Sequence, residues 1–71
     1  LGAALLAAGQ PDLAEQAYRQ DLQHYPNNGW SLNGLARALE RQNHTLQAQQ
    51  ARRAARTAFD RAQALPPDSR F

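Results

Sequence analysis

The feature that most constrains this chain is an internal repeat with a period of 34 residues. Shifting the sequence by 34 positions places the opening segment "LGAALLAAGQPDLAEQA" on "LARALERQNHTLQAQQA", which begins at Leu35. The identical pairs are Leu1/Leu35, Ala4/Ala38, Leu5/Leu39, Ala14/Ala48, Gln16/Gln50 and Ala17/Ala51. A period of this length is typical of stacked supersecondary units. We therefore expect two copies of one structural unit rather than a domain built around its own active site.

The chemistry of the turns repeats with the same period. Gly9 falls on Asn43, and these two residue types best tolerate the left-handed backbone that ends a helix. Pro11 falls on Thr45, and both suit the start of a helix. Each copy is therefore predicted to be a helix, a turn and a second helix, with turns at Gly9–Gln10 and at Asn43–His44.

The composition predicts an all-α fold. The chain has no Val or Ile, and its apolar content comes mainly from Ala and Leu, which favour helices. We expect helices over about 1–8, over 11–24 and over about 45–65. A further helix is expected to start after Asn27 or Asn28, either of which can cap it, and to run to the second turn. The helix over 11–24 carries an apolar stripe at helical spacing, formed by Leu13, Ala14, Ala17, Tyr18 and Leu22. The expected buried side of the last helix consists of Ala48, Ala51, Ala55, Ala58, Phe59, Ala62 and Leu65.

The repeat resembles the tetratricopeptide repeat, a helix–turn–helix unit that stacks into α-solenoids. The first copy matches the family pattern at Leu1, Gly2, Leu5, Gly9, Ala14, Tyr18 and Pro26, and the second at Leu35, Ala36, Leu39, Asn43, Ala48 and Ala55. The second copy departs from the pattern, because Arg52 replaces the aromatic residue and Asp60 the exit proline. The resemblance implies a truncated repeat over 1–26, a second repeat over 27–65 with a long capping helix, and an extended tail over 66–71.

The resemblance also implies a function and a binding surface. In this family the first helix of each repeat lines a concave groove that holds peptides, so Asn33, Arg37 and Arg41 become candidate partner-binding residues. Trp30 is either a further partner-binding anchor or a residue that packs on the preceding helix pair, and packing is the expectation. The subtype that clamps a peptide's terminal carboxylate is not expected, since Gly34 stands where its Asn belongs and the chain has no Lys. The predicted function is a non-enzymatic scaffold at the C-terminal end of a repeat array, bound to a protein or peptide.

Other functions have weaker support in the residues. The exposed strip expected from Arg52, Arg53, Arg56 and Arg61 suggests either a solvated outer face or, as the main rival, a small basic domain that binds nucleic acid. No aromatic residue lies among Arg52, Arg53 and Arg56, which argues against a site for single-stranded nucleic acid. His24 and His44 lie on different connections without a third ligand, and the chain has no Cys, so no metal or cofactor is expected. No catalytic motif is recognisable, and we expect no enzyme.

The start of the chain suggests a piece of a longer protein, since it begins at Leu1 without Met and any targeting signal would lie upstream. Arg without Lys, together with much Ala, hints at a GC-rich bacterial genome. No apolar run approaches a bilayer-spanning length, and the default expectation is a cytoplasmic location. Leu5 and Leu6 point about 100° apart on a helix, so Leu1, Leu5 and Leu6 cannot all be covered by the second helix. We expect an exposed apolar surface there and self-association through the first helix.

Overall fold

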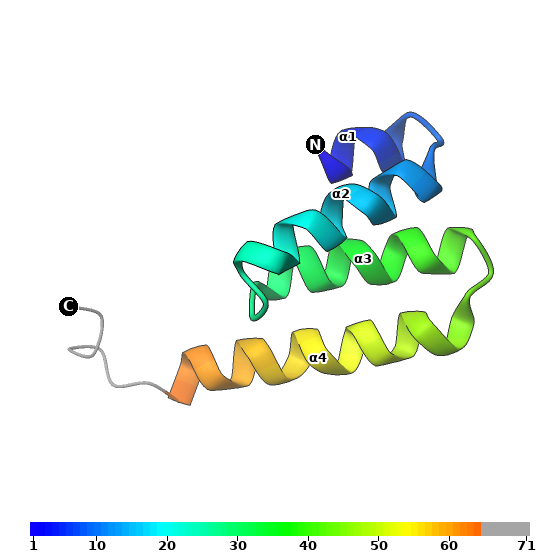
Figure 1. Cartoon of the computed structure of the whole chain (residues 1–71). Coiled ribbons are helices and arrows are strands. Elements are labelled where there is room, and N and C mark those ends of the chain that lie inside the picture. The colour runs from blue at the N-terminus through cyan, green and yellow to red at the C-terminus, as the bar shows by residue number, and fades with distance from the viewer. Residues whose placement is uncertain (65–71) are drawn as a thin grey trace.

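A computed structural model describes residues 1–64 of the chain, with the side chains of 1–61. Over this part the regular secondary structure consists of helices alone: α1 (Gly2–Ala7), α2 (Pro11–His24), α3 (Gly29–Arg41) and α4 (Thr45–Ala64). Consecutive helices run antiparallel and lie side by side in chain order, so that α2 is placed between α1 and α3 (Figure 1). The all-α prediction is confirmed. The tail over 66–71 and the side chains of Ala62 and Leu65 lie outside the described residues.

The two turns of the repeat have the same geometry. Gly9 has φ +76°, and Asn43, 34 positions later, has φ 66°. In both turns the residue after this left-handed position donates its N–H at 2.9 Å to a carbonyl five residues back, in Gln10–Leu5 and His44–Leu39. This bond closes the last helical turn and satisfies a terminal carbonyl. The matched turn residues were therefore correctly interpreted, and the 34-residue period is present in the backbone.

The core is centred on α3, which packs against both α2 and α4. Eight residues of α3 are buried: Gly29, Ser31, Leu32, Gly34, Leu35, Ala36, Ala38 and Leu39. Small residues occupy the contacts on its neighbours, where Ala14 of α2 is 0% exposed and Ala48 of α4 is 1% exposed. Asn28 starts α3, because its Oδ1 accepts the N–H groups of Trp30 and Ser31 at 3.0 and 3.3 Å.

The apolar stripe of α2 is covered less completely than its spacing indicates. Ala14 is fully buried and Leu22 is half-buried, but Leu13 is 42% exposed, so its assignment to the buried face was wrong. Leu13 lies about 100° around the helix from Ala14. The contact with α3 is centred on Ala14, and this angle leaves Leu13 at the edge of the stripe. On α4, Ala58 and Phe59 are half-buried rather than buried.

The first helix and Leu1, which precedes it, leave apolar surface uncovered, as predicted. Leu6 is 8% exposed and packs with Ala14 and Ala38, whereas Leu1 is 89% exposed. Leu5 is half-buried. Within residues 1–64, no helix combines the length and the apolar character that spanning a membrane requires.

Candidate functional site

A hollow of about 980 Å³ opens on one side of the helices and receives side chains from all four of them. Its lining consists of Ala3, Leu6, Ala7, Tyr18, Trp30, Asn33, Gly34, Arg37, Glu40, Arg41 and Arg52. The volume lies within the range of pockets that hold small ligands, about 300–1,000 Å³. Its long wall is α3, with α1 on one side and Arg52 of α4 on the other.

The four candidate partner-binding residues all line this hollow. Trp30, Asn33, Arg37 and Arg41 are spaced by three or four positions, so they form one stripe along the helix. All four side chains are exposed. Helical spacing grouped Asn33, Arg37 and Arg41 in the sequence, and Trp30 was a separate candidate; the structure places all four on one surface.

The charges of the lining are predominantly positive. Arg37, Arg41 and Arg52 face one acid, Glu40, which leaves a formal charge of +2 from three guanidiniums and one carboxylate. Arg52 Nη2 lies 2.5 Å from Glu40 Oε2, so these two groups neutralise each other. Arg41 Nη1 donates to the Leu6 carbonyl at 3.5 Å, at the C-terminal end of α1. Arg37 makes no ion pair with any described residue, and its guanidinium is therefore the cation best placed for a ligand.

Trp30 differs from its expected role. Its side chain is 78% exposed, and its ring contacts Phe59 of α4 edge to face, with centroids 5.4 Å apart and planes at 81°. The expectation that Trp30 packs on the preceding helix pair was therefore wrong. Gly29 leaves room for the Phe59 ring, because a Cβ at that position would lie 2.7 Å from Phe59 Cζ. The indole is thus supported on one side and open to solvent at the end of the hollow.

Tyr18 is a residue of the hollow that sequence reasoning placed only in the core. Its ring occupies the space left by two glycines, since a Cβ on Gly2 would lie 2.5 Å from Tyr18 Cζ and one on Gly34 would meet the same atom. The ring thereby joins α1, α2 and α3. It packs against two groups of buried residues, one centred on Leu35 and Leu39 and the other formed by Leu6, Ala14 and Ala38. A glycine inside a helical pattern, as at Gly34, is the sequence signal that indicates such close packing.

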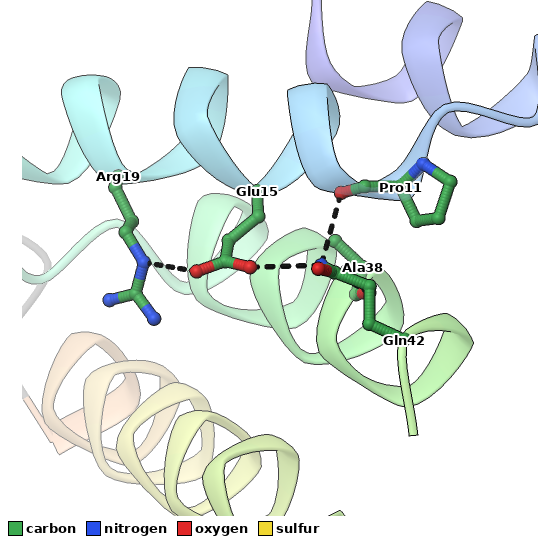
Figure 2. A network of polar contacts seen from close by, with 5 residues as sticks. All are labelled: Pro11, Glu15, Arg19, Ala38 and Gln42. Carbon is green, nitrogen blue, oxygen red and sulfur yellow. Dashed lines mark hydrogen bonds and ion pairs between the residues drawn. The ribbon is translucent and has the colours of Figure 1, made fainter. Parts of the chain in front are cut away.

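A polar network fixes α2 against the C-terminal end of α3 (Figure 2). Gln42 Nε2 lies 2.8 Å from Glu15 Oε1 and within 3.3 Å of the carbonyl oxygens of Pro11 and Ala38. Arg19 Nε donates to the other oxygen of Glu15 at 2.7 Å. The hydrogen bond from Arg19 is the main cause that holds the pKa of Glu15 below its ordinary value of 4.5; partial burial opposes this shift, and the Gln42 bond supports it.

A second polar contact holds the opposite ends of the same two helices. The buried Ser31 hydroxyl of α3 donates to Asp21 Oδ2 of α2, and Asn28 Nδ2 lies 3.5 Å from the same oxygen. Because α2 is bonded to α3 near both of its ends, the helix that carries Tyr18 and the helix that carries the stripe are held together by more than apolar packing. Such support keeps the α3 stripe and Tyr18 in a constant arrangement.

The basic strip of Arg residues lies along α4. Arg52, Arg53, Arg56 and Arg61 are all exposed, and the first three border a shallow depression with Gln49. Apart from the pair formed by Arg52 and Glu40, no ion pair involves these residues within the described part of the chain.

The chemistry available at the hollow is non-covalent binding: guanidiniums for carboxylates, an amide for hydrogen bonds, and an exposed indole for apolar or aromatic groups. No family model, curated protein or solved structure matches the chain.

Proposed function

We propose that this chain is a non-enzymatic scaffold that holds a segment of a partner protein in the hollow along α3. The observation that carries the proposal is the convergence of Trp30, Asn33, Arg37 and Arg41 on one open surface. From Trp30 to Arg41 the helix rises about 16 Å at 1.5 Å per residue. An extended chain at about 3.3 Å per residue covers this length with about five residues. A short peptide segment therefore matches the stripe.

We further propose that the two units are tetratricopeptide-like repeats at the end of an array. The 34-residue period and the two equivalent turns support this, as does a difference between equivalent faces of α2 and α4. The face of α4 that corresponds to the α3-facing side of α2 carries Arg52 and Arg56, where α2 has Tyr18 and Leu22. A polar outer face is what terminal repeats present to solvent.

The opposite face, on α1, is the proposed contact for a further helix. Ala4 corresponds to Ala38, which is fully buried beside α2, yet Ala4 is exposed and Leu1 is 89% exposed. By this internal comparison, α1 lacks the cover that α2 gives to α3. In the isolated chain, a second copy would supply that cover through a symmetric dimer. In a longer protein, a preceding repeat would occupy the same face.

Binding of peptides from a random twelve-residue display library tests the scaffold proposal. Peptides selected on the unmodified chain are expected to lose at least about tenfold in affinity for Arg37→Glu, since interface energy is concentrated in a few residues. Arg53→Glu is the matched control, because it makes the same charge change on an exposed residue outside the hollow. Affinity for this variant is expected to stay unchanged.

Two outcomes would contradict the proposal. One is a library that yields no peptide, or peptides equally sensitive to both substitutions. The other is a steeply salt-dependent binding of duplex DNA that is lost with Arg53→Glu, which would favour the nucleic-acid rival.

A further inference from the structure

The two ends of the α3 stripe differ in chemistry. One end is aromatic, because the exposed Trp30 ring stands there against Phe59. The other end is cationic, with Arg37 and Arg41 on the successive turns that follow. A ligand that uses both ends must itself carry two kinds of group in a fixed order along its length.

We infer that the hollow selects an acidic peptide in which an aromatic side chain is separated by a few residues from one or two carboxylates. This inference rests on the proposed function and specifies its ligand. The aromatic residue stacks on the open face of Trp30, and the carboxylates bond the guanidiniums of Arg37 and Arg41.

The helical rise sets the spacing of the ligand. Arg37 lies seven residues beyond Trp30 and Arg41 eleven, at a rise of about 10 and 16 Å. In an extended peptide these distances correspond to about three and five residues. The preferred ligand therefore has an aromatic residue with acidic residues about three and five positions away.

The existing contacts of the charged groups show which Arg residue, Arg37 or Arg41, binds a ligand carboxylate more strongly. Arg37 is uncommitted within the described part of the chain, so it bonds a carboxylate without breaking an existing contact. Arg41 gives up only a long bond, at 3.5 Å, to the Leu6 carbonyl. Glu40 is held by Arg52, so its carboxylate is compensated and does not repel the ligand. The contact at Arg37 is therefore the dominant one.

The same surface is less suited to single-stranded nucleic acid. Such sites stack successive bases on several aromatic rings along a cationic groove. Here one exposed indole stands at one end, and the net charge of the lining is only +2. An acidic peptide places its charges at the Arg side chains alone.

A matched peptide series tests the inference, and Trp30, the only Trp in the chain, reports binding through its fluorescence. The lead peptide is acetylated and amidated, so it has no terminal charge, and carries a phenylalanine with glutamates three and five positions later. The controls replace the phenylalanine by alanine, the glutamates by glutamine, or the glutamates by lysine. Two further peptides reverse the order or place the glutamates next to the phenylalanine.

We expect the lead peptide or its reverse to bind at least about tenfold more tightly than every control, as the loss of an anchor residue predicts. Arg37→Glu should abolish this preference and favour the lysine peptide, whereas Arg53→Glu should leave the preference unchanged. A single-stranded RNA, hexauridine, serves as the nucleic-acid probe. The inference would be overturned by equal affinity for the glutamine or lysine peptides, by no binding of any peptide in the series, or by tighter binding of hexauridine than of the lead peptide. If the inference fails but peptides selected from the library still require Arg37, the scaffold proposal stands without the acidic preference. If no selected peptide requires Arg37, the scaffold proposal and the acidic preference both fail.

Discussion

Replacing Gly34 by Ala tests the packing that shapes the hollow, because two effects of opposite sign act on one residue. In an exposed helix interior this change stabilises a protein by about 1 kcal/mol, since Ala is the better helix former. At Gly34, however, the added Cβ would meet the end of the Tyr18 ring. The ring cannot retreat toward α1, because Gly2 already lies against it. Overpacking of this kind costs about 1–3 kcal/mol, so we expect Gly34→Ala to lower the free energy of unfolding by about 1 kcal/mol.

The Tyr18→Leu background isolates the contact. The atoms that the new Cβ would meet are Cζ, Cε1 and the hydroxyl oxygen of Tyr18, and leucine has none of them. In this background Gly34→Ala should therefore stabilise the chain by about the full 1 kcal/mol of helix propensity. The effect of Gly34→Ala on the free energy of unfolding thus changes sign between the two backgrounds. The coupling energy is about 2 kcal/mol, within the range found for residues in contact.

Urea unfolding of the four proteins, followed by far-ultraviolet circular dichroism, measures this cycle. The midpoints and slopes give each free energy of unfolding, and equal slopes are required for the comparison. If Gly34→Ala stabilises the unmodified chain as much as the Tyr18→Leu chain, the ring is not confined between the two glycines. The tight contact that positions Tyr18 on the floor of the hollow would then be refuted.

Three further predictions concern stability and assembly. Ala48→Leu should cost about 1–3 kcal/mol by overpacking a 1% exposed contact, whereas Gln47→Leu, on an exposed neighbour, should leave the urea midpoint nearly unchanged. The folded-state pKa of Glu15 lies below its ordinary value of 4.5, so Glu15 stabilises the fold above that pH, and this stabilisation is lost as the pH falls through the folded-state pKa. In acid titrations followed by circular dichroism, the Glu15→Gln variant should lose less stability over this range than the unmodified chain. An equal loss in both proteins would contradict the assignment. The isolated chain should self-associate with rising concentration in light scattering, and Ala4→Glu on the uncovered face of α1 should keep it monomeric; a monomeric unmodified chain at high concentration would show that α1 needs no cover.

The local features of this fold could be predicted from the sequence because each depends on a few neighbouring residues. Gly9 and Asn43 indicated the two left-handed turns, and the pair Asn27 and Asn28 indicated the start of α3, which Asn28 caps. The stripe of Asn33, Arg37 and Arg41 followed from helical spacing alone. These features require no knowledge of how the helices pack.

The features that could not be predicted depend on contacts between helices. Trp30 turns toward Phe59, 29 positions later in the chain, and no local pattern specifies that pair. Tyr18 was assigned to the core from its spacing, but its position beside the hollow depends on the space left by Gly2 and Gly34 on two other helices. The exposure of Leu13 likewise follows from where α3 lies against α2.

The second unit carries Arg52 at the position where the first unit has Tyr18, and this difference connects the fold with the proposed function. In the first unit Tyr18 packs beneath α3, and Leu22 one turn later packs against the core. A helix placed on α4 as α3 is placed on α2 would bury the guanidiniums of Arg52 and Arg56 instead. Removing a charge from water costs several kcal/mol per ion, so the second unit disfavours such a neighbour. Arg52 remains beside the hollow and pairs with Glu40 there. The same change of residue that supports a terminal repeat therefore also gives the hollow its third guanidinium.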